Sequence, residues 1–316
     1  MENKKGINVS IIVPVYNEEG NIAKLDQEIK VSISKITPDF EIIYINDGSI
    51  DGTLKELEAL DNITVINLNR NYGQATALDA GFRACTGDYV VSLDGDGQND
   101  PADIPLLLEK LKNENLDVVT GWRKNRKDKS SINILTRIGR FFRHFLIGDT
   151  VHDTGCTLRV YTKEAVGCLD IGGEMHRYII ALLKWKGFKI GELIVNHRPR
   201  TVGKSKYNCS KAIRGFLDLV YIWFIQKYSQ RPLHLFGYLS VASLFLGFLS
   251  AFGTIYSKIV FGISVSRNGW SLVTFFLLLS GIMLFSFGIM IDLLLNIKFN
   301  TSKQERRYRI REVVKK

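Results

Sequence analysis

Two uncharged apolar segments near the C-terminus most constrain how this 316-residue chain folds. Residues 235–256 contain no Asp, Glu, Lys or Arg over about 22 positions, and residues 271–291 contain none over about 21. As helices, both are long enough to cross about 30 Å of hydrocarbon. Because a short connector separates them, we predict a transmembrane hairpin. A pair of buried core helices is the alternative, and it is disfavoured because both segments are apolar on every face.

Basic residues predict how this hairpin is oriented. Lys227 and Arg231 precede the first segment, whereas the connector holds only Lys258 and Arg267. More basic residues follow the second segment, namely Lys298, Lys303, Arg306, Arg307, Arg309 and Arg311. Because Lys and Arg favour the cytosolic side, we expect both termini and the large N-terminal domain to lie in the cytosol, at the cell membrane.

The net charge of +10 raises the question of a nucleic-acid partner. Much of the basic excess lies beside the apolar segments and in the C-terminal tail, where an anionic lipid surface explains it. We therefore expect the chain to contact a lipid bilayer and not nucleic acid. The N-terminal residues have no apolar core of the kind found in signal peptides, so none is expected to be removed.

The first half of the chain alternates short apolar runs with amphipathic ones, which predicts an α/β fold with a mostly parallel sheet flanked by helices. Runs rich in Ile and Val predict strands buried on both faces, at residues 9–15, 41–46, 64–68, 89–93 and 117–120. The intervening segments predict helices at residues 19–35, 51–60, 74–85 and 103–112.

Two further segments, residues 132–147 and 209–228, place apolar and basic residues at helical spacing. Such helices lie on a membrane surface or pack into a core, and the pattern alone leaves both open. The expected organisation is a cytosolic catalytic domain, a juxtamembrane amphipathic segment, two transmembrane helices (about 235–256 and 271–295) and a basic cytosolic tail. Their respective limits are 1–207, 208–231, 232–296 and 297–316.

Acidic residues at the ends of predicted strands are the strongest functional signal. The strand at 89–93 ends in Asp94, Gly95 and Asp96. Glu18 and Asp47 follow other strands, and the carboxyl ends of parallel strands form ligand-binding crevices. No GxGxxG or GxxxxGK[ST] motif is present, which argues against dinucleotide and P-loop chemistry.

The residue types at this strand end suit a metal and a diphosphate. Asp94, Asp96 and Gln98 offer hard oxygen ligands for Mg²⁺ or Mn²⁺. Two carboxylates leave coordination positions for water and substrate phosphates. An exposed acidic turn is the alternative for a three-residue motif taken alone.

Several longer stretches give this motif a context. They are PVYNEE at 14–19, NDGSIDGT at 46–53, RNYGQATALDAG at 70–81, LDGDGQNDP at 93–101, DTGCTLR at 153–159 and HRPRTVGKSKY at 197–207. In this order they resemble family 2 glycosyltransferases of the GT-A fold, specifically the polyprenyl-phosphate glycosyltransferases. The resemblance covers the predicted cytosolic domain, and the hairpin is similar to that of membrane-anchored members.

The resemblance implies a donor site for a nucleotide-diphosphate sugar of UDP or GDP type. The residues that it places around the nucleotide are Pro14, Tyr16, Glu18, Asp47 and Asp94. Asp96 would hold the metal on the diphosphate with help from Gln98, and Asp94 is a further candidate ligand. Gly95 and Gly97 stand where Ala and Leu are usual, and we expect them to loosen the loop backbone.

The resemblance also implies a polyprenyl phosphate acceptor, which fits a membrane-anchored chain. Candidates to hold its phosphate are Arg123, Arg137 and Arg140, since guanidinium groups match phosphate oxygens. Anchoring to lipid headgroups is the alternative, most evenly balanced for Arg140. The basic residues Arg200, Lys204 and Lys206 flank Gly203 in a loop that either closes over the donor diphosphate or is simply solvated.

The implied reaction is a single displacement with inversion, in which the lipid phosphate attacks the sugar. Asp153 and Glu174 are expected nearest the reaction, either as a base or as positioning groups. A processive polysaccharide synthase is a rival interpretation, but its usual QxxRW motif is absent. A non-catalytic membrane scaffold is another. Small residues in the apolar segments permit close helix packing and homo-oligomers, namely Gly247, Ser250, Gly281, Ser286 and Gly288.

Overall fold

The computed structural model describes residues 8–124, 151–173, 175–199, 219–224, 227–228, 231–301 and 310–315. The chain divides into two compact units. The first comprises Met1–Leu219 together with Arg306–Lys316, and we call it the sheet unit. The second comprises Val220–Glu305, and we call it the hairpin unit. The predicted Glu174, Arg137, Arg140, Arg200, Lys204 and Lys206 lie outside the described residues.

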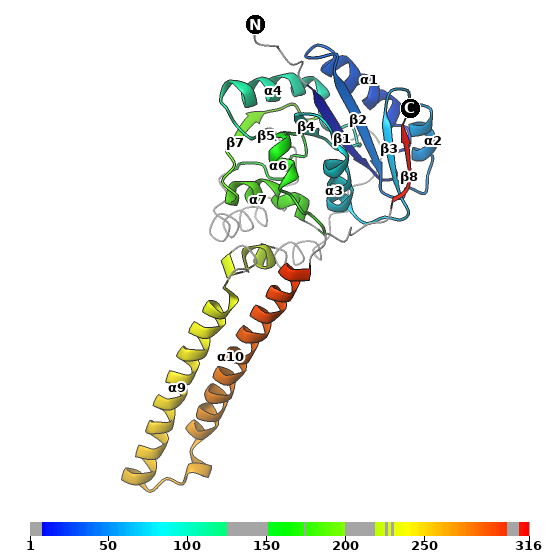
Figure 1. Cartoon of the computed structure of the whole chain (residues 1–316). Coiled ribbons are helices and arrows are strands. Elements are labelled where there is room, and N and C mark those ends of the chain that lie inside the picture. The colour runs from blue at the N-terminus through cyan, green and yellow to red at the C-terminus, as the bar shows by residue number, and fades with distance from the viewer. Residues whose placement is uncertain are drawn as a thin grey trace. The chain divides into compact units, whose positions relative to one another are not determined.

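An eight-stranded sheet forms the centre of the sheet unit (Figure 1), with the strand order β7-β5-β6-β4-β1-β2-β3-β8. The strands are β1 (Val9–Val15), β2 (Phe40–Asn46), β3 (Thr64–Leu68), β4 (Tyr89–Ser92), β5 (Val118–Trp122), β6 (Arg159–Thr162), β7 (Ile190–Ile194) and β8 (Ile310–Lys315). Neighbours pair in parallel except where β6 meets β4 and β5 and where β8 meets β3. The predicted mostly parallel α/β sheet is confirmed.

Helices cover both faces of this sheet. One hydrophobic cluster joins α1 (Ile22–Ile33) and α4 (Ile104–Asn113) to the strands. A second cluster joins α3 (Gln74–Ala84), α6 (Lys163–Gly167) and α7 (Ile179–Trp185) to the opposite face. Other described helices of this unit are α2 (Thr53–Glu58), η1 (Pro101–Asp103) and η2 (Met175–Tyr178). Two core layers therefore hold the strands from both sides.

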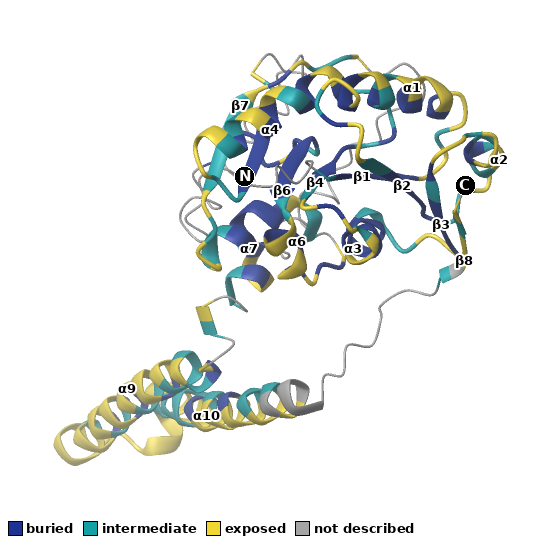
Figure 2. Cartoon of the chain, turned by 45° about the horizontal axis from the view of Figure 1, so that its top comes forward, coloured by how far each residue is buried: buried dark blue, intermediate teal, exposed yellow. Residues whose placement is uncertain are grey.

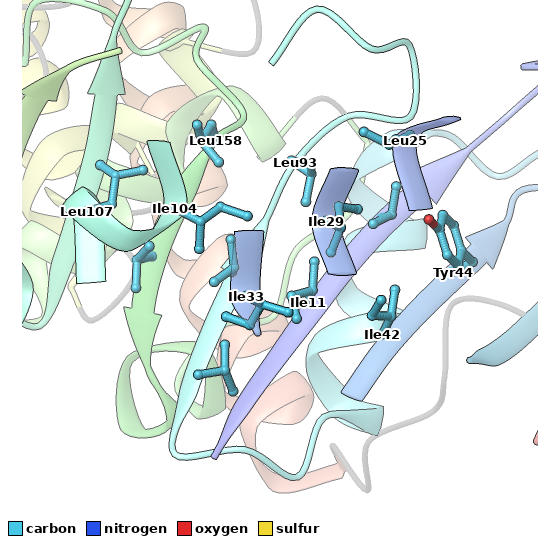
Figure 3. Packing of buried hydrophobic residues seen from close by; sticks show 14 of the residues in the cluster. Ile11, Leu25, Ile29, Ile33, Ile42, Tyr44, Leu93, Ile104, Leu107 and Leu158 are labelled. Carbon is cyan, nitrogen blue, oxygen red and sulfur yellow. The ribbon is translucent and has the colours of Figure 1, made fainter. Parts of the chain in front are cut away.

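Strand β1 shows why the sheet forms where the sequence predicts. All its residues are buried, and successive side chains point to opposite faces. Ile11 packs with Ile29 and Ile33 of α1 (Figure 3), whereas Ile12 belongs to the opposite cluster. The central strands are accordingly dark blue in Figure 2. A segment rich in β-branched residues suits a strand buried on both faces.

Element boundaries differ from the predicted ones where the backbone turns. The helix predicted at 19–35 begins at Ile22, because Asn17 (φ 55°) and Gly20 (φ 87°) adopt left-handed conformations before it. The strand predicted at 117–120 runs from Val118 to Trp122. Strands β6 and β7 were not predicted, since each is short and β7 is only partly buried.

The C-terminal residues differ most from expectation. Residues 297–316 were predicted as a basic tail, yet α10 continues to Thr301 and Ile310–Lys315 forms β8. β8 pairs antiparallel with β3, with Val313 opposite Ile66. The partly exposed Ile310 packs against the core cluster that contains α3. A segment that follows the hairpin in sequence therefore completes the sheet of the first unit.

The hairpin unit contains α9 (Pro232–Phe261), a short η3 (Val265–Arg267) and α10 (Gly269–Thr301). Both long helices extend beyond the predicted 235–256 and 271–295, and both are long and apolar enough to cross a membrane. Large apolar side chains such as Phe245 and Phe252 point outward at 67% and 70% exposure. Figure 2 shows this as yellow helices. These features are typical of a membrane protein.

Small and hydroxylated residues lie between α9 and α10. Ser240 Oγ donates to Gly281 O at 2.7 Å, and Ser243 Oγ lies 2.7 Å from Ser280 Oγ. At Gly281 a Cβ atom would lie 2.6 Å from Leu244 Cγ, so glycine allows the two helices to approach closely.

Candidate active site

The loops that follow β1 and β2 are joined by hydrogen bonds at the carboxyl ends of the strands. Asn17 N donates to Ser49 Oγ at 3.0 Å, and Glu18 N donates to Thr53 Oγ1 at 2.8 Å. Tyr16 beside them is 43% exposed, so its ring is accessible. These two loops carry the predicted nucleotide-binding residues Tyr16, Glu18 and Asp47.

Pro14, the fourth predicted residue of this group, lies inside β1 and is buried. It faces Ile45 of β2 in the parallel ladder. A contact between Pro14 and a nucleotide stays a prediction.

Asp47 is a buried carboxylate that organises the turn before α3. It accepts hydrogen bonds from Tyr72 N at 2.7 Å and Gly73 N at 2.9 Å. Burial raises its pKa, and these two hydrogen bonds oppose the rise. Both its oxygens therefore hold the backbone of a neighbouring turn, and its place in the lining of a nucleotide pocket stays a prediction.

Gln74 is a site residue that the sequence analysis did not identify. It is the first residue of α3, and its Nε2 donates to Asp94 Oδ1 at 2.6 Å. Gly73 before it has φ 93°, so the Gln74 side-chain amide follows a sharp turn of the backbone. The RNYGQATALDAG stretch contains Gln74, but a single amide at a helix start has no distinctive spacing.

Asp94 and Asp96 form a pair of neighbouring carboxylates after β4. Asp94 is half-buried, and burial together with the charge of Asp96 raises its pKa to about 7. A hydrogen bond from Thr157 and the charges of Arg123 and Arg159 oppose this rise. A buried carboxylate whose ionisation is opposed by burial and by a neighbouring carboxylate fits a site for a divalent cation, which would relieve that repulsion.

Glycines fix the backbone of this loop. A Cβ atom at Gly95 would lie 2.6 Å from Val15 Cγ1, so the loop packs closely on β1. Gly97 has φ 71°, a conformation that few other residues adopt. Each glycine therefore meets a specific steric demand, and the expectation that Gly95 and Gly97 loosen the loop stays a prediction.

Arg123 and Asp153 form a bidentate ion pair next to this loop. Arg123 Nε lies 2.7 Å from Asp153 Oδ2, and Nη2 lies 3.0 Å from Oδ1. Both side chains are about nine-tenths buried. Hydrogen bonding and the charge of Asp153 raise the pKa of Arg123 against the effect of burial. A carboxylate held in this way is suited to positioning an arginine.

The DTGCTLR stretch at 153–159 contacts the acidic loop through Thr157. Asn99 Nδ2 donates to Thr157 Oγ1 at 2.8 Å, and Ser92 Oγ donates to Thr157 O at 2.8 Å. Arg159, on β6, is buried and donates to Thr154 O at 2.7 Å. Its charge favours the ionised form of Asp94. Strand pairing of β6 with β4 thus brings this segment to Asp94.

Arg198 fixes the entrance to the predicted basic loop, and it too was missed. Its backbone N–H donates to Gln98 O at 2.9 Å, and its guanidinium contacts Asp100 Oδ1 at 2.8 Å and Glu28 Oε2 at 2.6 Å. The HRPRTVGKSKY stretch therefore begins beside the acidic loop. Arginine in a basic run gives no sequence signal for such a specific partner.

Metal ligands come from few side chains here. In the described ranges, no group of three or more His, Cys, Asp or Glu residues is arranged to hold a metal ion. Asp94 and Asp96 are the acidic residues predicted as ligands, so other ligands would come from water, substrate phosphates or an amide. Gln98 uses its backbone N–H to contact Asp96 Oδ1 at 3.1 Å, and its role as a ligand stays a prediction.

Comparisons with known proteins agree with this arrangement. Residues 10–170 match the family model "Glycosyl transferase family 2". A dodecaprenyl-phosphate galacturonate synthase of Rhizobium johnstonii is 32% identical, covering 92% of this chain and 88% of the relative. An undecaprenyl-phosphate 4-deoxy-4-formamido-L-arabinose transferase of Pseudomonas fluorescens is 32% identical, covering 83% and 76%.

Solved structures share the fold. Glucosyl-3-phosphoglycerate synthase from Mycobacterium tuberculosis, in complex with Mn²⁺, UDP and glucosyl-3-phosphoglycerate, matches with a TM-score of 0.57 at 17% identity, covering 70% of this chain and 80% of that one. Mannosyl-3-phosphoglycerate synthase from Rubrobacter xylanophilus matches with a TM-score of 0.58 at 17% identity, covering 70% and 75%. With its GT-A type sheet and its matching motifs, the chain belongs to glycosyl transferase family 2 and is a glycosyltransferase.

Proposed function

We propose that this glycosyltransferase moves a sugar from a nucleotide-diphosphate sugar to a polyprenyl phosphate at the cytosolic membrane face. The observation that carries the proposal is the juxtaposition of Asp94 and Asp96 with the braced arginine Arg123 in a chain that also has an apolar helical hairpin. Its relatives are named for transfer to dodecaprenyl and undecaprenyl phosphate. The acidic pair would hold the metal that binds the anionic donor, and Arg123 would bind the phosphate of the lipid acceptor.

A divalent metal, Mg²⁺ or Mn²⁺, is part of the proposal. Asp96 and Asp94 would hold it, and Gln98 is a further candidate ligand. When bound, the metal neutralises the charge that develops on the leaving diphosphate. A structural neighbour of the same fold was crystallised with Mn²⁺ and UDP, which supports this donor class. Tyr16, Glu18 and Asp47 lie on the loops proposed to surround the nucleotide.

The proposed chemical step is a single displacement. An oxygen of the lipid phosphate forms a bond to the anomeric carbon while the bond from that carbon to the diphosphate oxygen breaks. The nucleoside diphosphate leaves, and the configuration inverts. A phosphate monoester has a second pKa near about 6, so much of it is already dianionic at neutral pH and needs no general base.

Asp153 accordingly takes a positioning role in this proposal. Its carboxylate accepts from Arg123 Nε and Nη2 and from Gly155 N, so its oxygens are already engaged. Arg123 would then orient the acceptor phosphate. Residues outside the described ranges keep their predicted roles in the proposal: Arg137 and Arg140 at the acceptor, Arg200, Lys204 and Lys206 at the donor diphosphate, and Glu174 near the reaction.

The test is a transfer assay on membranes that contain the full chain. Labelled UDP- and GDP-sugars are supplied with undecaprenyl phosphate and Mg²⁺ or Mn²⁺, and the lipid product is identified by mass spectrometry. We expect one donor to give a labelled lipid and Asp96→Ala to lower the rate by about 10²- to 10³-fold. Asp61→Ala, at an exposed acidic residue, is the matched control. Labelled lipid from no donor would overturn the proposal.

A further inference from the structure

Two adjacent residues of one segment pair with two adjacent residues of another beside the proposed acceptor site. Trp122 stacks on His152, with ring centroids 4.3 Å apart and planes 16° apart. The next residue along each segment makes the bidentate ion pair, since Arg123 Nε lies 2.7 Å from Asp153 Oδ2. The aromatic contact and the ion pair thus join the same two segments, residues 122–123 and residues 152–153, at successive positions.

Glu192 of β7 fixes this arrangement to the sheet. Its Oε1 accepts from His152 N at 2.8 Å, and its Oε2 lies 2.8 Å from His152 Nδ1. Glu192 stands opposite Thr120 of β5 in the parallel ladder, two residues before Trp122. The imidazole is therefore held by a ring on one side and by a carboxylate anchored in the sheet.

The exposure of His152 indicates that this arrangement does more than stabilise the core. Its side chain is 58% exposed, whereas that of Asp153 is only 8% exposed. A half-exposed ring buries little apolar area, so it contributes little through the hydrophobic effect. What the contacts of His152 do fix is the direction of the backbone that carries Asp153.

Within the described residues, the side-chain hydrogen bonds of Arg123 go to Asp153, which leaves N–H donors for an anion. Arg123 Nε and Nη2 contact Asp153, and a guanidinium carries five N–H donors in a rigid plane. Bidentate recognition of a phosphate depends on the orientation of that plane. A shift of Asp153 would rotate the plane of the Arg123 guanidinium. The contacts that hold His152 therefore act on Arg123 indirectly, through the neighbouring Asp153.

We propose that Trp122, His152 and Glu192 form a clasp that positions the Arg123 guanidinium for the acceptor phosphate. None of the three needs to touch the acceptor, and each acts through the Arg123–Asp153 pair. This inference rests on the proposed function, in which Arg123 binds the phosphate of the lipid. It identifies three positioning residues for that binding step.

The experiment compares Michaelis constants for the two substrates in the full chain purified in detergent. We expect His152→Ala and Trp122→Ala to raise KM for undecaprenyl phosphate about tenfold, the effect of losing one charge-assisted hydrogen bond. KM for the donor sugar should stay within about twofold of wild type. Trp122→Phe, which keeps a ring on His152, should recover most of the loss. Glu192→Gln should give a smaller rise.

Two controls separate positioning from a general loss of structure. Glu114→Gln removes an exposed charge that pairs with Lys110 at 2.6 Å, and it should leave both constants unchanged. In an Arg123→Ala background, His152→Ala should cause no further rise in KM for the acceptor, because the clasp acts through Arg123. A further rise of the same size as in wild type would overturn the inference.

The remaining outcomes are also decisive. If wild type makes labelled lipid and neither Trp122→Ala nor Glu192→Gln changes KM for the acceptor, the clasp is wrong while the proposed function stands. If wild type makes none, the proposed function fails and the clasp fails with it. If His152→Ala does not fold, as judged by its melting temperature, Trp122→Ala and Glu192→Gln carry the same comparison.

Discussion

The two units of this chain place apolar side chains in opposite directions. In the sheet unit, residues such as Ile11 and Val91 are fully buried and polar groups gather at the strand ends. In the hairpin unit, Phe245 and Phe252 point outward, and hydroxyl groups such as that of Ser243 lie between the helices. Similar residue types therefore build one unit around an apolar interior and the other around a partly polar contact.

The difference follows from the solvent that each unit is built for. In water, burial of apolar area drives folding, so side chains in the sheet unit gain from leaving the surface. Between membrane helices that force is absent, and close packing and hydrogen bonds hold the helices together. Single substitutions should therefore have opposite sensitivities in the two units.

The largest expected effect comes from deleting core volume. Ile11→Ala should lower the free energy of unfolding of the sheet unit by about 2–5 kcal/mol, because it leaves a cavity between β1 and α1. The measurement is urea unfolding in detergent, followed by near-ultraviolet circular dichroism. The matched change Leu246→Ala, at a 51% exposed position of α9, should have little effect on hairpin stability. Equal losses in the two units would break the comparison.

The next effect is steric, and here a single substitution should destabilise the hairpin unit. Gly281→Val should destabilise the hairpin by about 1–3 kcal/mol, because its Cβ would meet Leu244 Cγ at 2.6 Å. Unfolding by sodium dodecyl sulfate in bicelles measures this loss. Gly253→Val is the control, since no atom lies within 4 Å of a Cβ there. A Gly281→Val hairpin as stable as that of the wild type would contradict the close approach of the helices.

A third prediction concerns the ionisation of a buried carboxylate in the sheet unit. The pKa of Asp94 is raised to about 7, so the metal-free folded protein holds a proton that the unfolded chain releases near about pH 4. Its contribution to stability is therefore greatest below about pH 4 and is lost as pH rises through 7. Mn²⁺ must displace that proton, so its affinity should rise about tenfold between about pH 6 and pH 8.

Titration with Mn²⁺, followed by electron paramagnetic resonance, checks this dependence. Asp94→Asn should remove most of the rise with pH, whereas Asp61→Asn should retain it. A wild-type affinity that stays constant from about pH 6 to pH 8 would show that Asp94 is already ionised in the metal-free protein.

The smallest effect tests the polar contact inside the hairpin. Ser243→Ala removes hydrogen bonds to Leu277 O and Ser280 Oγ, both at 2.7 Å, and should cost about 0.6 kcal/mol. Ser257→Ala is the control, because Ser257 bonds only to Gly253 O of its own helix at 2.9 Å. Unfolding in detergent should show that Ser243→Ala is less stable than Ser257→Ala. Identical unfolding curves would show that the contact of Ser243 with α10 does not stabilise the hairpin.

Local patterns predicted much of this architecture. β1 was predicted with its observed limits because a run of Val and Ile between polar residues specifies a strand without reference to partners. The apolar helices followed from their composition. The acidic pair at Asp94 and Asp96 was visible because the chain changes from apolar to acidic where a strand ends.

Contacts between distant segments could not be predicted in the same way. Gln74 reaches Asp94, and Arg198 reaches Asp100, only because the sheet order brings those loops together. Strand β8 is a short segment of mixed polarity, and its partner β3 lies far away in sequence. No local periodicity carries such information, since it depends on the pairing of whole strands.

The position of β8 has a consequence for biosynthesis. β3 is made early, and its edge pairs with a strand that follows both long helices in the sequence. The ribosome must therefore have made both long helices before this edge can be closed. Until then the growing chain carries an unpaired strand edge, which is a site where other chains can add. Synthesis of the helical hairpin thus comes before the sheet can be completed.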